Sequence, residues 1–215
     1  LAAALEEASP GDKLLVASFG QGCDVLAFEV TDKIKDLKPR IGVKGSLANR
    51  VELTNYQKFT KFRELITADL GIRGEANPNT SLTLLWRRRK MLLGLVGVRC
   101  RKCGTPQYPI YPTCVNPTCW SVNDFEDYEF SDKEAKILMF TGDMLAASVD
   151  PPAVYGLISF EGGGRTMLDF TDCNLNQLKV GMKAKMSFRR RVTDNMRGFT
   201  GYFWKAVPQV EGGGE

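Results

Sequence analysis

Short apolar runs near the start of the chain predict a pair of strands. Residues 13–18 and 24–30 are apolar runs joined by the glycine turn 19–23. Two such runs around a glycine turn predict a hairpin of buried strands. A lone hairpin cannot bury both of its faces, so we expect it to pack against something larger that this sequence does not contain. Residues 1–11 are typical of a helix end, closed by Pro10 and Gly11.

The middle of the chain carries apolar positions at helical spacing. The stripe consists of Tyr56, Phe59, Phe62 and Leu65. The residues 54–57 before it fit a capping box, and such a stripe usually docks on a neighbouring surface. After a loop over 71–79, the pattern predicts a second helix from Thr80 to Leu93, ended by Gly94.

From Ser121 onward the pattern changes to short strands. The runs lie at 154–160, 165–170, 183–188 and 201–207. About five strands with a glycine-rich hairpin and no long helix favour a small Greek-key barrel of the OB type. We interpret Gly162, Gly163 and Gly164 as a tight turn, because no helix or Gly-Lys-Ser/Thr run follows to make a phosphate loop.

Composition bounds the class of protein. The chain has 215 residues, 43% of them hydrophobic, and a net charge of +4 that is unevenly spread. No apolar run reaches the 18 or more residues of a membrane span, so we expect a cytoplasmic protein. Because it begins without methionine inside a helix-like run, we expect a processed or truncated piece.

Four cysteines lie within twenty residues and form the densest set of soft ligands in a chain without histidine. They are Cys100, Cys103, Cys114 and Cys119, in the spacing C-x2-C-x10-C-x4-C. Four thiolates close a tetrahedral shell around Zn²⁺, which leaves no position for water or substrate. The spacing therefore predicts a structural zinc ribbon. Two disulfides and free thiols remain as alternatives, and the four-residue gap in the second pair is longer than usual.

The other candidate groups are less specific. Arg87, Arg88 and Arg89 lie toward the end of the second predicted helix, where cations suit the helix dipole. The alternative is an anion contact. Cys23 and Cys173 have no neighbouring base, so we interpret both as structural, small buried hydrophobes.

Several motifs together resemble one family. They are the run Trp86-Arg-Arg-Arg-Lys90, the run Gly97-Val-Arg-Cys-Arg-Lys-Cys-Gly-Thr105, and the closing Tyr202-Phe-Trp204. They resemble the acyl-CoA-associated accessory proteins with a rubredoxin-like zinc ribbon and an OB-fold, over residues 80–208. Residues 11–30 look like the final strands of a thiolase-superfamily enzyme, nearest to the hydroxymethylglutaryl-CoA synthase and ketoacyl synthase III branch.

The resemblance implies an organisation in five parts. Residues 1–31 would be the terminal hairpin of a thiolase-like fold, and 32–79 a connector with a docking helix. Residues 80–120 would hold the basic helix and the zinc ribbon. Residues 121–210 would form the OB-fold barrel, and 211–215 a flexible tail. The expected fold class is mainly β with a few helices.

The function implied is that of a non-catalytic accessory subunit or domain in an acyl-CoA-condensing complex. It would dock a thiolase-fold catalytic subunit and help hold or channel a CoA thioester, in a hetero-oligomer. That superfamily uses a cysteine activated by histidine, and this chain has no histidine. The phosphates of CoA are polyanionic, so charge and position, not the resemblance, point to Arg87, Arg88, Arg89 and Arg165 as first contacts to test.

Two other classes of function remain open. A zinc-ribbon and OB module can bind single-stranded nucleic acid, using basic groups and stacking aromatics. Residues 189–191, three arginines, and the aromatic run 202–204 favour that alternative. The third possibility is a purely structural dimerisation tail, which would leave the basic clusters without a role.

Overall fold

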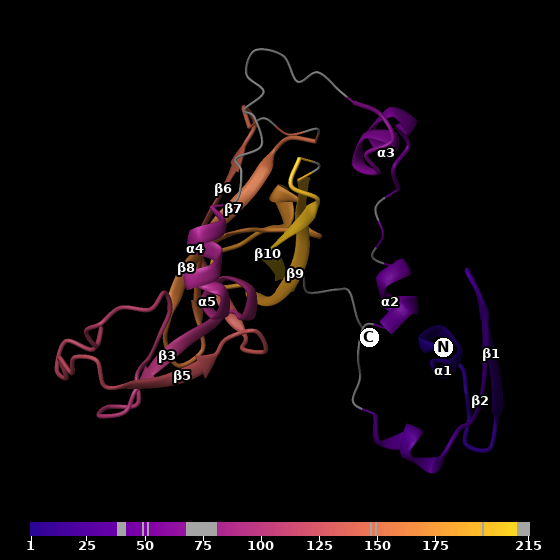
Figure 1. Ribbon diagram of the computed structural model, residues 1–215, viewed down its shortest axis with the longest axis horizontal. Coiled ribbons are helices and arrows are strands. Elements are labelled where there is room, and N and C mark those ends of the chain that lie inside the picture. Colours follow the sequence, from indigo (N-terminus) through magenta and orange to yellow (C-terminus); the bar gives the residue numbers. More distant parts are fainter. Residues whose placement is uncertain are drawn as a thin grey trace. The chain divides into compact units, whose positions relative to one another are not determined.

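The chain is mainly β with a few short helices, as the sequence predicts (Figure 1). The computed structural model describes residues 1–37, 42–48, 50, 52–67, 81–146, 148, 150–194 and 196–209. They belong to two compact units, Leu1–Thr54 and Asn55–Val210. Within the described ranges no helix has the length and apolar character needed to cross a membrane. The predicted loop over 71–79 lies outside them.

The first unit is built around a hairpin. Its elements are α1 (Ala2–Leu5), β1 (Lys13–Phe19), β2 (Cys23–Glu29), the 3-10 helix η1 (Asp32–Asp36) and α2 (Gly42–Ala48). β1 and β2 pair antiparallel, with Lys13 opposite Glu29 and Phe19 opposite Cys23. The predicted hairpin is therefore confirmed to within one residue at each end of each strand.

Much of the apolar surface of this hairpin is exposed within its own unit. Leu15 and Phe19 are 73% and 87% exposed on one face, and Leu26 is 55% exposed on the other. Two strands alone provide no second layer to cover either face. That the hairpin packs against a larger body stays a prediction.

The second unit begins with α3 (Tyr56–Phe62). The Asn55 side chain accepts a hydrogen bond from the Lys58 amide at 3.1 Å, so the helix is capped one residue later than the predicted box. The apolar stripe is exposed, not docked: Tyr56 is 74% and Phe62 45% exposed. Two partly exposed ion pairs connect this segment to the rest of the unit, from Lys58 in α3 to Asp150 and from Glu64, two residues after the helix, to Arg190.

The predicted basic helix is broken into α4 (Leu82–Arg87) and α5 (Arg89–Gly94). Arg88 lies between them with φ −114° and ψ 19°, outside the helical region. Two aromatic side chains hold α5: Trp204 Nε1 donates to Leu93 O at 3.0 Å, and Tyr108 Oη donates to Met91 O at 3.1 Å. We attribute the change of direction to these tertiary bonds, which local spacing does not encode.

A small three-stranded sheet follows α5. It consists of β3 (Val96–Cys100), β4 (Pro106–Gln107) and β5 (Phe125–Glu129), in the order β4-β3-β5. All its pairings are antiparallel. This sheet carries the cysteine-bearing loops at one end (Figure 1).

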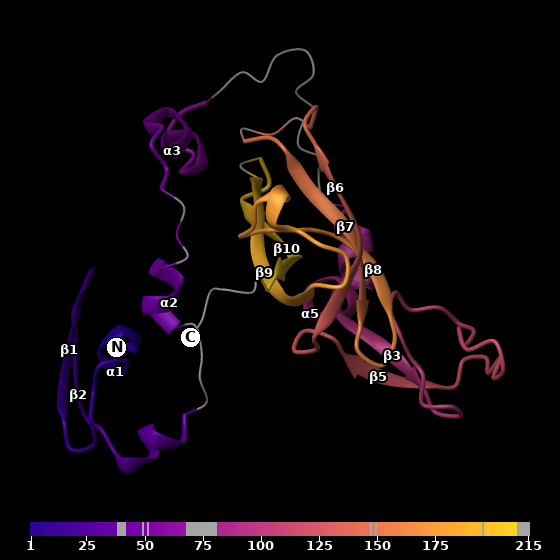
Figure 2. The same cartoon turned by 180° about the vertical axis from the view of Figure 1, so that it is seen from behind.

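The largest sheet is a curled, partly closed barrel (Figure 2). Its strands are β6 (Ala135–Asp143), β7 (Ala153–Phe160), β8 (Arg165–Asp169), β9 (Lys183–Asp194) and β10 (Phe199–Pro208). Their order is β10-β9-β6-β7-β8, and a parallel bridge from Phe170 to Ala206 brings the two edges together. The 3-10 helix η2 (Leu175–Gln177) lies between β8 and β9. The five-stranded arrangement confirms the expected OB-type barrel.

Phe130 joins the small sheet to the barrel. It is fully buried, and its ring lies 5.0 Å from that of Tyr128 and 4.8 Å from that of Phe160, between centroids. The predicted glycine turn packs on it from the barrel side. Gly164 has φ +87°, and a Cβ there would lie 2.9 Å from Phe130, so the turn requires glycine twice over.

Candidate metal centre

The first cysteine pair lies in a tight turn at the end of β3. Cys100 is the last residue of the strand, and its amide donates to Thr105 O at 3.0 Å. The Gly104 amide donates back to Cys100 O at 2.8 Å, with Gly104 at φ +75°. That left-handed conformation suits glycine, and the resulting turn points Cys100 and Cys103 toward the same space.

The second pair lies on a loop that folds back on itself. An isolated bridge joins Thr113 to Val122, and the Cys114 amide donates to Ser121 O at 2.8 Å. Within the loop, the Cys119 amide donates to Asn116 O at 3.0 Å. The four intervening residues therefore form a closed turn, which accommodates the long spacing that the sequence left in question.

Gln107 anchors this loop, and sequence reasoning missed it. The side chain is 2% exposed; its Nε2 donates to Tyr111 O at 3.0 Å and to Thr113 O at 3.4 Å. Its Oε1 accepts from the amide of Val115 at 3.1 Å. One buried amide thus satisfies three backbone groups around Cys114.

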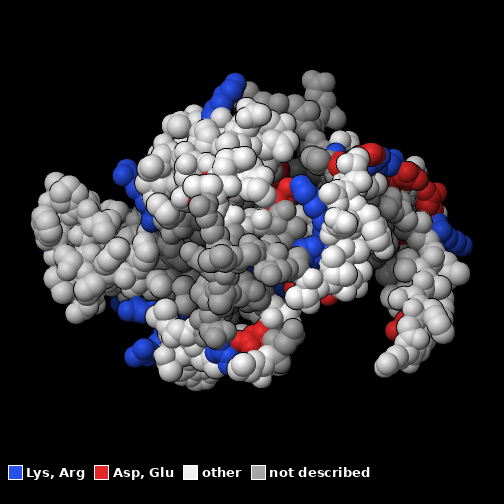
Figure 3. Space-filling model, turned by 90° about the horizontal axis from the view of Figure 1, so that it is seen from above, with Lys and Arg blue, Asp and Glu red and all other residues white. Residues whose placement is uncertain are grey.

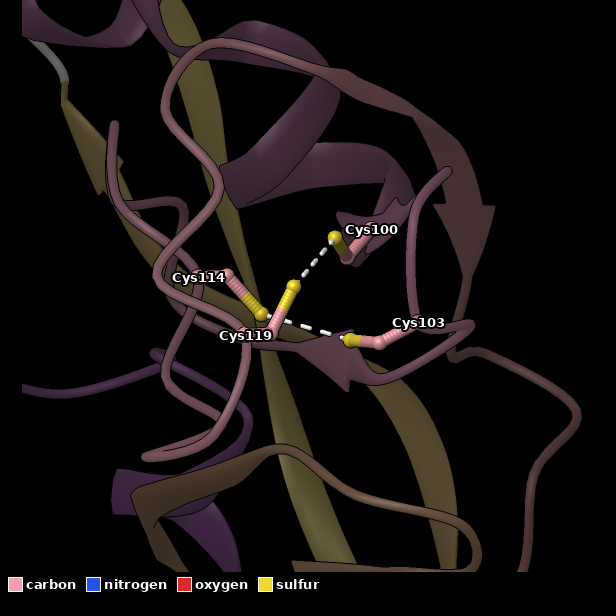
Figure 4. Close-up of side chains that lie close together, drawn as sticks. All are labelled: Cys100, Cys103, Cys114 and Cys119. Atoms are coloured by element: carbon pink, nitrogen blue, oxygen red, sulfur yellow. Dashed lines mark hydrogen bonds between the residues drawn. The ribbon is translucent and has the colours of Figure 1, made fainter.

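The four sulfur atoms converge (Figure 4). The Sγ atoms of Cys103 and Cys114 are 3.5 Å apart, those of Cys100 and Cys119 are 3.8 Å apart, and all four lie within 4.8 Å of one another. A tetrahedron with Zn–S bonds of about 2.3 Å has edges of about 3.8 Å. The cysteines are free thiols, so the disulfide alternative finds no counterpart in this structure.

The environment of the thiols favours binding of a cation. A hydrogen bond with the Thr105 side chain lowers the pKa of Cys103 to about 6. Burial raises the pKa of Cys114 to about 12, because a lone thiolate there would be poorly solvated. Zn²⁺ compensates such buried negative charge and displaces the thiol protons on binding. The donor set fits structural zinc, which would hold the two loops together.

The predicted arginines are exposed, and the structure does not gather them into one pocket. Arg87, Arg88 and Arg89 follow one another across the α4–α5 break. The Arg89 guanidinium lies 4.5 Å from the centroid of the Trp86 ring, which is 69% exposed. Arg165 begins β8, and its amide donates to Tyr108 O at 3.1 Å. The Tyr108 hydroxyl also donates to Met91 O in α5, so one residue connects the start of β8 to the helix that follows Arg88.

The remaining cysteines lie apart from this cluster. Cys23 is exposed at the start of β2, so the expectation of a buried thiol is wrong for it. Cys173 is half-buried, and burial raises the pKa of its thiol. An unreactive neutral thiol suits the structural interpretation of Cys173.

The features that favour nucleic acid are present, but ion pairs engage two of the three arginines. The rings of Phe188 and Tyr202 stack at 5.3 Å between centroids. Ion pairs with Asp172 and Glu64 engage two of the neighbouring arginines, Arg189 and Arg190. On the side seen in Figure 3, the Lys and Arg side chains form separate small groups.

Together, a four-cysteine knuckle and an OB-type barrel define a zinc-ribbon protein. Residues 93–123 match the family model described as "ChsH2, rubredoxin-like zinc ribbon domain". A DUF35 domain-containing scaffold protein of Methanocaldococcus jannaschii is 31% identical over 126 residues, which cover 57% of this chain and 87% of that protein. The chain belongs to the DUF35 scaffold protein family. A second such protein, from Methanothermobacter thermautotrophicus, is 24% identical and is covered to 98%.

Two solved structures show similarity to part of the chain. One is described as an Ltp2-ChsH2(DUF35) aldolase, with 18% identity, a TM-score of 0.44 and coverage of 62% of this chain and 98% of that one. The other is a DUF35-family protein of unknown function from Sulfolobus solfataricus, with 17% identity, a TM-score of 0.37 and coverage of 69% and 97%.

Proposed function

We propose that this chain is a non-catalytic scaffold of an acyl-CoA-condensing assembly, which docks a thiolase-fold catalytic subunit and helps hold its CoA thioester. The observation that carries the proposal is the kinship to DUF35 scaffold proteins over most of their length. The chemistry of the chain supports it. Four of the six thiols belong to a site that zinc would close, and the sequence has no histidine to activate a nucleophile.

The docking part of the proposal rests on α3. The ion pairs of Lys58 in α3 and of Glu64 just after it leave the apolar stripe of the helix exposed. Tyr56 and Phe59 stack at 5.9 Å between centroids and present aromatic surface. Aromatic groups exposed along one face of a helix are typical of an anchor for a partner protein. The hairpin β1–β2 is a second contact, and its exposed Leu15 and Phe19 support this.

The CoA part of the proposal rests on charge. The Arg89 guanidinium lies over the exposed Trp86 ring, and Arg87 and Arg88 directly precede it in the chain. Arg165 and α5 both form a hydrogen bond with Tyr108. Guanidinium groups bind phosphates through paired, charge-assisted hydrogen bonds. In the proposed complex these groups hold the phosphates of CoA while the catalytic subunit performs the carbon–carbon chemistry.

Affinity purification of the tagged chain from its source organism, with mass spectrometry, tests the docking. A thiolase-fold enzyme in near-equal amount is expected, and its absence would refute the docking part. The isolated chain should show no thiolase or synthase turnover. Measurable turnover by the chain alone would overturn the assignment as a scaffold.

Calorimetric titration with CoA tests the ligand part, on the chain and on its complex. Arg88→Gln removes an exposed charge at the helix break, and we expect CoA affinity to fall roughly tenfold or more. Arg191→Gln, an exposed arginine on β9, is the matched control and should bind CoA normally. Equal affinities for the two variants would exclude Arg88 as a phosphate contact.

A further inference from the structure

The outward face of β6, β7 and β8 carries an apolar row that no described segment covers. Met139, Leu157 and Met167 lie directly opposite one another across the three strands. Met139 is 56% and Met167 61% exposed, while the neighbouring Gly156 and Ile158 face the buried interior. Side chains alternate along β7 and β8, and residues directly opposite one another on paired strands point to the same side, so all three residues of the row point outward.

Charged groups flank this row on opposite sides. On one side lies the row of Lys136, Ser159 and Arg165, and on the other the row of Thr141, Tyr155 and Asp169. Within the described residues, neither Arg165 nor Asp169 forms an ion pair. Along the strand direction, this face therefore carries a basic row, then an apolar row, then an acidic row.

This order is complementary to itself under one particular two-fold rotation. If the axis runs along the apolar row, the row packs on its own copy, and Arg165 of each chain lies opposite Asp169 of the other. If the axis runs parallel to the strands, Lys136 lies opposite Arg165 of the second copy, and the like charges repel. Charge therefore selects the first arrangement, which is a closed isologous contact.

We infer that this face is a self-association surface on which a second copy of the chain packs, sheet on sheet, with the apolar rows in register. Methionine suits such a contact because its unbranched side chain adapts to the facing surface. The face spans three strands about 4.8 Å apart and roughly six residues of about 3.3 Å each. That is small for a specific interface, so the dimer forms reversibly at high protein concentration. The inference goes beyond the scaffold role and needs neither CoA nor a catalytic subunit.

Sedimentation velocity from about 10 μM to about 1 mM tests the association over the affinity range of weak complexes. We expect a shift from monomer to dimer across this range. Met139→Glu and Met167→Glu, each placing a carboxylate in the row, should keep the chain monomeric throughout. Met196→Glu is the matched control, because Met196 is 95% exposed in the turn before β10 and should leave the shift unchanged. Circular dichroism verifies that all variants are folded.

A charge exchange tests the orientation. Arg165→Asp or Asp169→Arg alone sets like charges together, and we expect dimer affinity to fall roughly tenfold or more. The double variant carrying both changes restores the opposite pairing and should recover the affinity. A monomer at the highest concentration, or a dimer that survives both glutamate variants, overturns the inference. The inference is also overturned if the double variant has no higher dimer affinity than either single variant, or if this face binds a different protein and not a second copy.

Discussion

Replacing Gln107 by leucine tests whether one buried amide holds the second cysteine pair in place. Leucine has nearly the same volume but cannot form the three hydrogen bonds to Tyr111 O, Thr113 O and the Val115 amide. A buried polar group left unsatisfied costs about 1–3 kcal/mol. Three groups set an upper limit near 9 kcal/mol, but Tyr111 is 54% exposed, so water replaces part of the loss. We expect about 3–5 kcal/mol of lost stability.

The same change should weaken metal binding. Val115 follows Cys114 directly, so releasing its amide loosens a ligand that Gln107 orients without touching the metal. Losing such a supporting contact typically costs 10–100-fold in metal affinity, and we expect a loss of about that size.

Guanidinium unfolding of the zinc-loaded protein measures the first quantity, and competition with a chromogenic chelator measures the second. Gln177→Leu is the matched control: Gln177 is exposed and accepts one hydrogen bond, from the Asn174 amide, so its loss should cost under about 1 kcal/mol. If Gln107→Leu unfolds within about 1 kcal/mol of the natural chain and keeps its zinc affinity, the anchoring role is refuted.

Three further changes probe other parts of the molecule. Metal analysis should give one zinc per chain, and Cys100→Ser should lose both the metal and the ribbon structure, whereas Cys173→Ser should keep both; a stable, metal-free natural protein would contradict this. Phe130→Ala should destabilise the fold by about 3–5 kcal/mol in denaturant unfolding, as for a fully buried phenylalanine, and a loss below about 1.5 kcal/mol would argue against its joining role. A hydrogen bond from Lys183 lowers the pKa of Glu134, so the stability this carboxylate contributes is present above its unfolded pKa of about 4.3 and is lost as pH falls through the lower folded value. Glu134→Gln should flatten the stability curve in that acid window, and an unchanged slope would show that the ion pair has no effect.

Much of the fold is predictable because the relevant patterns are local. The hairpin around residues 19–23 and the turn at Gly162–Gly164 are marked by glycine between apolar runs, and both form where expected. The sequence pattern does not mark β6, because a bulge between Ile137 and Met139 interrupts its alternation of apolar and polar residues. The break at Arg88 depends on hydrogen bonds from two aromatic side chains that are distant in the chain, and the spacing of apolar residues in a helix does not reveal them.

The candidate metal centre is predictable for a chemical reason, since thiol groups in a tight spacing have few other uses in a chain of this kind. Its support is not. Gln107 is a single glutamine between Pro106 and Tyr108, and no periodicity or motif marks it. Its role arises only when the loop at 111–115 folds back over β4. The outward row at Met139 is equally hidden, because its members come from three strands and meet only through register.

The barrel closes between β8 and β10 at a single bridge, where the Thr171 amide donates to Ala206 O at 3.0 Å. A seam held at one point opens locally at low free energy, well below that of global unfolding. In hydrogen–deuterium exchange, the backbone amides of β8 that point away from β7 should therefore exchange earlier than those of β6, which has a strand on both sides. β8 carries Arg165, Met167 and Asp169, so its packing against a second molecule should slow that exchange, and the seam would report on assembly.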